Sequence, residues 1–207
     1  MIFLKKSIAR DTVLLTLIQF VTQIISLVLN VFINKNLGTE NLGLMSLTNA
    51  FFTFAIIISN GNIFVSASRF VSEEIGRENG NPGKIFGFSL IFCLILSTVS
   101  AAAVTALAVP VSRSVIRDKS AAGAVRLLAC SLPLAAVSSC IKGYFNAYRR
   151  IMIPALSETA AFTVRSVIMA LSAGILIENG TLTVYTAIAL SVICSEAVRL
   201  AVLIIFI

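Results

Sequence analysis

The stretch Ile85–Val109 reads IFGFSLIFCLILSTVSAAAVTALAV and contains no acidic or basic side chain. A helix needs about 20 consecutive apolar residues to cross the hydrocarbon core of a bilayer. The whole chain has a similar character, with 58% hydrophobic residues, 12% charged residues and a mean hydropathy of +1.00. A soluble domain of 207 residues cannot hide that much apolar surface from water. The sequence therefore predicts an all-α membrane protein.

The other apolar stretches are separated by turn signals, and together they predict a bundle of six transmembrane helices over residues 1–207. The expected spans are Thr12–Asn34, Leu44–Phe64, Ile85–Val109, Gly123–Ile141, Pro154–Ile177 and Thr183–Phe206. Asn and Gly residues between Asn36 and Gly43 predict a break between the first two spans, and Pro110 is expected to close the third. The last apolar run ends at Ile207 without a polar flank, so we expect the chain to be truncated at its C-terminus.

Basic residues lie mostly between the apolar stretches and predict the orientation of the chain. If the N-terminus is cytoplasmic, nine of them fall on the inner side: Lys5, Lys6, Arg10, Arg69, Arg77, Lys84, Lys142, Arg149 and Arg150. Five fall on the outer side: Lys35, Arg113, Arg117, Lys119 and Arg126. This excess favours a cytoplasmic N-terminus. The net charge of +7 is thus explained by topology, and no basic patch interleaved with aromatic residues predicts a nucleic-acid partner.

Residue types that support enzyme or metal chemistry are scarce in the chain. Histidine, the commonest general base and metal ligand, is absent. The four cysteines lack metal-ligand spacing and are expected to be buried free thiols: Cys93, Cys130, Cys140 and Cys194. The sequence therefore predicts neither an enzyme nor a metal or cofactor site.

The first span carries a polar stripe whose members are spaced three or four residues apart. They are Thr12, Thr16, Gln19, Gln23, Ser26 and Asn30. Such residues share one helical face, and amide groups that faced lipid would lack hydrogen-bond partners. The stripe therefore predicts either a helix–helix contact joined by amide hydrogen bonds or the wall of a hydrated cavity. In the second case Gln19, Gln23 and Asn30 are candidate substrate-binding residues.

The second span repeats this pattern with Ser46, Asn49, Thr53 and Asn60, and Asn49 is a further candidate for the cavity. At Asn60-Gly61-Asn62 two amides flank a glycine that weakens the helix. The sequence favours a helix end that frays at the inner interface over a broken helix that lines a binding site. Residues 69–78 then predict a helical extension, either lying in the interface or solvated.

Arg165 is the strongest single candidate for substrate binding. It follows Pro154 by eleven positions, which places it about 16 Å into a hydrocarbon core of roughly 30 Å. A cation at this depth is normally turned inward and bound to a partner. Glu158 shares its face but lies nearly two turns away, so a direct salt bridge between the two is not expected, although Glu158 remains a cavity candidate. An anionic ligand and a structural partner on another helix both fit Arg165.

Glu196 and Arg199 in the sixth span are three residues apart and are expected to pair along the helix. Arg199 lies near enough to the inner surface for its side chain to reach the interface. The sequence therefore favours a structural role for this pair.

Several segments resemble a known superfamily. The most specific is Lys142–Arg150, KGYFNAYRR, followed by Ile153–Glu158, IPALSE, and then Arg165. Leu37–Gly43, LGTENLG, and Ser68–Glu74, SRFVSEE, extend the similarity toward the N-terminus. Over essentially its whole length the chain resembles the polysaccharide biosynthesis and stage V sporulation protein B branch of the multidrug/oligosaccharidyl-lipid/polysaccharide exporter superfamily.

The resemblance implies that residues 1–207 are the N-terminal lobe of a two-lobe, MATE-like transporter with a central cationic cavity. Such proteins move lipid-linked oligosaccharides or peptidoglycan precursors across the bacterial cytoplasmic membrane by alternating access. Arg165 matches the arginine of the family's fifth span, which implies an anionic undecaprenyl-pyrophosphate ligand. Because the second lobe is missing, a further segment or a partner chain is also implied. Relatives that flip lipid II carry charged residues in the first span, where this chain has Asn30 and neutral neighbours.

Two other functions fit parts of the sequence. A cation-coupled multidrug exporter of the same superfamily needs an intramembrane acidic residue, but the first span has none, and Glu158 and Glu196 lie toward the inner ends of their spans. A non-transporting membrane assembly or sporulation factor would keep its activity without Arg165. For a flippase, the sequence predicts that Arg165→Ala abolishes export whereas Arg199→Ala does not.

Overall fold

The computed structural model describes residues 2–78, 80–112, 121–179 and 181–207. Its description of side chains excludes those of residues 2–12, 15, 29–30, 32–42, 44–45, 48, 121, 173–179 and 181–185. The described residues form six α-helices and no strand, which confirms the all-α prediction. The helices are α1 (Ile2–Asn60), α2 (Ile63–Ile75), α3 (Pro82–Val111), α4 (Ala121–Ala147), α5 (Met152–Asn179) and α6 (Thr181–Ile205).

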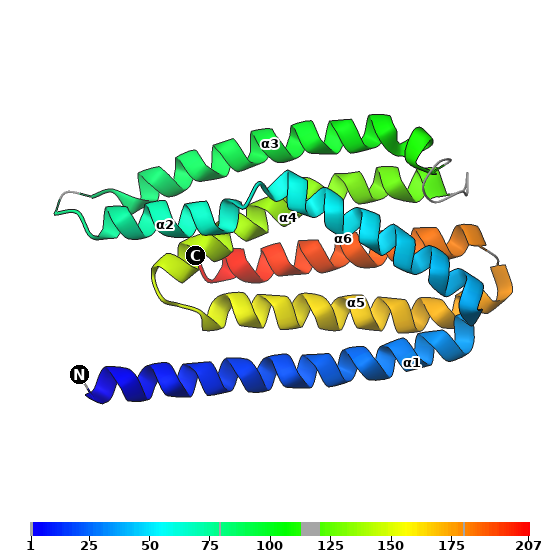
Figure 1. The fold of residues 1–207 in the computed structure, drawn as a ribbon, viewed down its shortest axis with the longest axis horizontal. Coiled ribbons are helices and arrows are strands. Elements are labelled where there is room, and N and C mark those ends of the chain that lie inside the picture. Colours follow the sequence, from blue (N-terminus) through cyan, green and yellow to red (C-terminus); the bar gives the residue numbers. More distant parts are fainter. Residues whose placement is uncertain (1, 79, 113–120, 180) are drawn as a thin grey trace.

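Helix α1 contains the whole first predicted span and most of the second. The predicted break between Asn36 and Gly43 is wrong, because the helical backbone continues through these residues. The change of direction is nevertheless present, because the α1 ribbon turns back on itself (Figure 1). The first arm contains Thr16–Val28, and the second arm contains Asn49 and the residues that follow it to Asn60. Isolated glycines cost a helix only about 1 kcal/mol each, so Gly38 and Gly43 do not suffice to end it.

The remaining helices agree with the predicted spans except at their ends. Pro110 does not close the third span, since α3 continues one residue beyond it to Val111. Helix α4 runs past the predicted Ile141 to Ala147, and α5 begins at Met152 with Pro154 in its first turn, as expected. These differences fall at helix ends, where boundaries are least determined by hydrophobic periodicity.

The break at Gly61 and Asn62 falls near the middle of the apolar helical segment Asn49–Ile75, not at a helix end that frays at the interface. Gly61 and Asn62 both adopt left-handed backbone conformations, with φ of 47° and 59°, and α2 continues the span beyond them. A Cβ atom on Gly61 would lie 2.9 Å from Leu96, which is at the middle of α3. The sequence placed this break near the inner end because charged residues follow it, but α2 extends the span by 13 residues.

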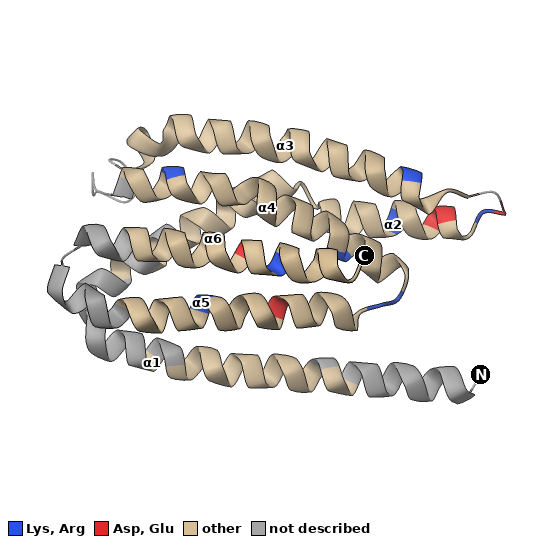
Figure 2. Ribbon diagram, turned by 180° about the vertical axis from the view of Figure 1, so that it is seen from behind, with Lys and Arg blue, Asp and Glu red and all other residues tan. Residues whose placement is uncertain are grey.

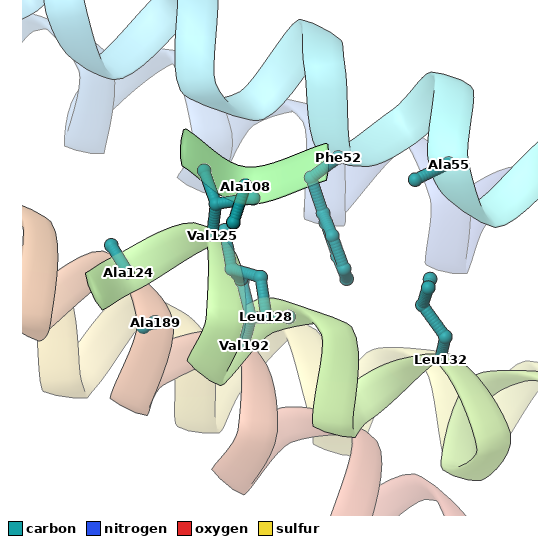
Figure 3. Close-up of a cluster of buried hydrophobic side chains, with 9 residues drawn as sticks. All are labelled: Phe52, Ala55, Ala108, Ala124, Val125, Leu128, Leu132, Ala189 and Val192. Carbon is teal, nitrogen blue, oxygen red and sulfur yellow. The ribbon is translucent and has the colours of Figure 1, made fainter. Parts of the chain in front are cut away.

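Helix α4 is the central element of the bundle. Buried residues of α1, α3 and α6 meet those of α4 in one apolar cluster: Phe52, Ala55, Ala108, Ala124, Val125, Leu128, Leu132, Ala189 and Val192 (Figure 3). In the most apolar window of α4, 67% of the residues are buried, compared with 11% for α3. Many of the cluster residues are small, so the helix backbones approach closely, as is usual where packing rather than water exclusion joins membrane helices.

The outer faces of the bundle are strongly apolar. Phe88, Phe92 and Ile95 on α3 each expose about 60% of their surface. Four helical segments of the described residues are long and apolar enough to cross a bilayer: Asn49–Ile75, Pro82–Val111, Ala122–Ala147 and Thr186–Ile205. The chain is therefore a multi-pass membrane protein. The first arm of α1 contributes a shorter apolar segment, Thr16–Val28, and the count of six spans stays a prediction.

The ends of the helices alternate between the two ends of the bundle. The N-terminus, the α2–α3 turn, the α4–α5 connection and the C-terminus all lie toward one end (Figure 1). This is the arrangement expected when both chain ends share one side of a membrane. The expected free thiols are present, but Cys130 is exposed rather than buried, whereas Cys93 and Cys140 are buried.

Helices α2 and α4 make a contact that depends on a glycine. A Cβ atom on Gly143 would lie 2.7 Å from the carbonyl oxygen of Phe64 and 3.1 Å from the Cβ of Ala67. Any larger side chain at this position must push the two helices apart. A neighbouring hydrogen bond, from Asn146 Nδ2 to Ser68 Oγ at 3.0 Å, fixes the register of the same crossing.

We predict that Gly143→Leu destabilises the bundle by about 2 kcal/mol, because the added side chain overpacks the α2–α4 contact. The midpoint temperature (Tm) of thermal unfolding in detergent micelles measures this effect. Gly123→Leu is the matched control on the same helix, since nothing lies within 4 Å of the Cβ position there. An equal fall in Tm for both variants would contradict the close approach at Gly143.

Candidate functional site: a polar cleft beside buried charges

A cleft of about 370 Å³ lies between the first arm of α1, the N-terminal half of α5 and α6. Most of the side chains around it are polar or charged, although the bundle as a whole is apolar. The lining residues are Ile18, Gln19, Thr22, Gln23, Ala155, Glu158, Thr159, Phe162 and Arg199. Polar groups gathered at one place in a membrane bundle indicate a hydrated or ligand-binding site.

Two members of the predicted polar stripe, Gln19 and Gln23, line this cleft. Both are exposed, and no described residue of another helix is shown hydrogen-bonded to either amide, so the cavity-wall interpretation of the stripe is favoured at these positions. Thr22, which the stripe did not include, also faces the cleft while its hydroxyl donates to the carbonyl of Ile18 at 2.8 Å. The side chain of Asn30 lies outside the described residues.

Glu158 lines the cleft and forms an ion pair across helices. Lys142 Nζ on α4 donates to Glu158 Oε1 at 2.9 Å. The Lys142 side chain is largely buried, whereas that of Glu158 is more than half exposed. Glu158 is therefore bound to Lys142 rather than to Arg165, in agreement with the prediction that Glu158 and Arg165 do not pair. The sequence pattern placed Lys142 on the inner side of the membrane and did not predict its contact with Glu158.

Arg165 and Asn49, two of the predicted candidates, are brought together by the fold. Arg165 Nη2 on α5 donates to Asn49 Oδ1 on the second arm of α1 at 2.8 Å. Neither residue is among those that line the cleft. Arg165 also lies within electrostatic range of Glu196 and Arg199 on α6. It thus belongs to a cluster of charges beside the cleft.

The Glu196–Arg199 pair is present, as predicted, with Arg199 Nη1 at 2.6 Å from Glu196 Oε1. Glu196 is only 4% exposed, and its Oε2 has no hydrogen-bond partner among the described residues; the same holds for Arg199 Nε. Arg199 also lines the cleft, a position that the predicted pairing did not include. The position of Arg199 in the sequence predicted only the depth of this residue in the membrane. What its side chain faces depends on how α1 packs against α6.

The charges around the cleft have a positive excess. Three basic side chains, Lys142, Arg165 and Arg199, accompany two acidic ones, Glu158 and Glu196. Figure 2 shows basic and acidic positions along the neighbouring helices α5 and α6, away from the helix ends. Guanidinium groups bind phosphate oxygens through charge-assisted hydrogen bonds, and amides and hydroxyls bind sugar hydroxyls. This arrangement is suited to binding an anionic, hydroxyl-bearing group.

Residues 8–207 match the family described as polysaccharide biosynthesis protein. The chain belongs to this family. A curated relative in the sporulation branch, stage V sporulation protein B from Bacillus subtilis (strain 168), is 24% identical over 177 residues, which cover 85% of this chain and 34% of that protein. The chain thus spans about a third of the length of this relative. No solved structure matches it.

Two of the segments that resemble the family meet in space. Ser68–Glu74 lies on α2, and Lys142–Arg150 covers the end of α4 and the turn that follows it. They are joined by the Gly143 contact and by the Asn146–Ser68 hydrogen bond. Lys142, the first residue of the second segment, also provides the partner of Glu158. The two segments therefore pack against each other, and none of their described residues lines the cleft.

We predict that the cleft contains water in the membrane. In a parent with Cys130→Ser, Gln23→Cys is expected to react with a charged, membrane-impermeant thiol reagent at least about tenfold faster than Val21→Cys, because the reactive thiolate forms only in contact with water. Val21 is a suitable control, since it is 54% exposed on the opposite face of the same helical arm and does not line the cleft. The reaction rates are measured in native membrane vesicles. Equal rates would show that the two faces of α1 have the same surroundings.

Proposed function

We propose that the protein is one lobe of a flippase that moves a lipid-linked oligosaccharide or peptidoglycan precursor across the membrane by alternating access. The observation that carries this proposal is the polar cleft beside a cluster of charges with one more basic than acidic side chain, inside an otherwise apolar bundle. Membership of the polysaccharide biosynthesis protein family supports the same class of cargo. A transporter of this kind needs no catalytic residue, cofactor or metal.

The chemistry of the cleft fits the two parts of such a headgroup. Arg199 lines the cleft, and its Nε has no hydrogen-bond partner among the described residues. An undecaprenyl-pyrophosphate headgroup would supply the phosphate oxygens that a guanidinium prefers. Gln19 and Gln23 offer amide donors and acceptors to sugar hydroxyls or to a peptide. In this proposal Arg165 and Asn49 hold α1 against α5 and add positive charge behind the site.

A second lobe, or a partner chain, completes the transport path in this proposal. Alternating access needs two bodies that move relative to one another, and the match covers 34% of stage V sporulation protein B. The exposed side of α1, with Phe20, Ile24 and Leu27 next to the cleft, is where we expect the second body to lie. The missing wall of the cleft would then come from that body.

We further infer that the protein lies in the bacterial cytoplasmic membrane with its N-terminus in the cytoplasm. The distribution of basic residues supports this orientation, and both chain ends lie toward the same end of the bundle (Figure 1). In this orientation the N-terminal half of α5 and the C-terminal half of α6 lie on the cytoplasmic side, and the cleft opens between them.

A cation-coupled drug exporter is less well supported than a flippase. Its coupling site needs an acidic side chain free to exchange a cation or proton, whereas Glu196 is bound to Arg199 and Glu158 to Lys142. A second alternative is a membrane assembly factor that transports nothing, which is consistent with the name of the relative, stage V sporulation protein B.

The proposal predicts that Arg199→Ala lowers flipping at least about tenfold, because it removes the guanidinium from the cleft. This revises the sequence-based expectation that only Arg165 is required; Arg165→Ala is expected to lose flipping as well. Flipping is measured in proteoliposomes as the rate at which a fluorescent polyprenyl-pyrophosphate-linked sugar becomes accessible to a membrane-impermeant quencher. Arg126→Ala on the exposed side of α4 is the matched control and is expected to keep the wild-type rate.

If wild-type proteoliposomes, prepared with any required partner chain, flip the probe no faster than protein-free vesicles, the flippase proposal is wrong. If all three arginine variants also retain biological activity in cells, the assembly-factor alternative is favoured.

A further inference from the structure

The break between α1 and α2 is a second polar site, separate from the cleft. Gly61 N donates to the carbonyl oxygens of Ile57 and Ile58, both at 3.3 Å, and thereby ends α1. The helical pattern then restarts at Asn62, whose carbonyl accepts from Val65 N and Ser66 N. Because Gly61 faces the middle of α3, this interruption lies deep in the hydrocarbon region, where water is not available to satisfy the exposed backbone groups.

Side chains from α1 and α4 bring further unsatisfied oxygen atoms to the break. Asn60 Nδ2 donates to Ser139 Oγ on α4 at 3.2 Å, which orients the amide. The other amide atom, Asn60 Oδ1, is buried and has no hydrogen-bond partner in the described part of the chain. Ser59, one residue earlier, is 1% exposed, and its hydroxyl is likewise without a partner there. A buried acceptor without a donor is costly, so a bound species is expected to compensate for it.

A cavity of about 290 Å³ is lined by Asn60 and Ser139, among others, and offers room for such a species. The polar residues that line it are Asn60, Asn62 and Ser139, and the others described around it are apolar, so no Lys, Arg, Asp or Glu among the described residues lines it. The last turn of α1 also contains no basic residue. The partial negative charge at the C-terminal end of α1 is therefore not neutralised by a nearby cation of the protein.

We propose that this break binds a sodium ion. Its ligands are Asn60 Oδ1, Ser139 Oγ and carbonyl oxygens of the last turn of α1, which form a set of neutral hard oxygen donors. Broken membrane helices bind alkali cations in this way, with the negative end of a half-helix pointing at the ion. An anion is disfavoured, because the unpaired side-chain atom of Asn60 is an acceptor. The inference concerns cation binding by this chain and holds whatever the cargo is.

The test is the thermal stability of the purified full chain in lipid nanodiscs, measured in sodium chloride and in choline chloride of equal ionic strength. Sodium at a saturating concentration is expected to raise the Tm of the wild type by roughly 5 °C, because a ligand that binds only the folded state stabilises it. Asn60→Leu and Ser139→Ala are expected to lose most of this shift. Asn60→Asp is expected to bind sodium at least about tenfold more tightly, since a carboxylate replaces the amide oxygen.

Ser191→Ala is the matched control for Ser139→Ala. Ser191 is also buried, but its hydroxyl donates to its own helix at Ile188 O, and the residue does not line the cavity. This variant should keep the full sodium-dependent shift. The proposal is overturned if sodium and choline give the wild type the same Tm, or if Asn60→Leu and Asn60→Asp both keep the wild-type shift and sodium affinity. Since no transport is measured, failure here leaves the flippase proposal untouched, and the reverse also holds.

Discussion

Hydrocarbon supplies no hydrogen-bond partners, so every polar group that this chain carries into the bilayer must find a partner inside the protein or in enclosed water. The described contacts follow from this constraint. Lys142 pairs with Glu158, Arg165 with Asn49, and Arg199 with Glu196, each within 3 Å. Serine and threonine hydroxyls mostly return to the carbonyls of their own helices. Among the described residues, the groups that remain unpaired include Glu196 Oε2 and Arg199 Nε beside the cleft, and Ser59 Oγ and Asn60 Oδ1 at the helix break.

Helix packing and polar pairing cooperate in building the cleft. Small residues let α4 approach α2, α3 and α6 closely, and this leaves the first arm of α1 to be held mainly through α5. A long side chain such as Arg165 spans the wider distance to the second arm of α1. The cleft opens where α1 is not covered by close packing. Its polar lining is tolerated because water or a ligand, rather than lipid, fills the space.

Composition and apolar run length were sufficient to predict the helical class, the membrane setting and most helix positions. They did not predict that α1 continues through Gly38 and Gly43, because an isolated glycine lowers helix stability by only about 1 kcal/mol and need not end a helix. The three-residue spacing predicted the Glu196–Arg199 pair, since both partners lie on one helix. Contacts between different helices could not be predicted in this way, because periodicity shows which residues share a helix face but not which neighbouring helix covers that face. For this reason Arg165 and Asn49 were recognised separately, whereas Lys142 and Arg199 were given no place at the site.

The glycine contact between α2 and α4 has a mechanical consequence. Backbone touches backbone at Gly143, and the Asn146–Ser68 hydrogen bond prevents the two helices from sliding. These helices must then move as one rigid body, together with α3, which packs against both. Relative motion within the bundle is then left to boundaries with fewer close backbone approaches, such as the one between α1 and α6. The polar cleft lies at that boundary.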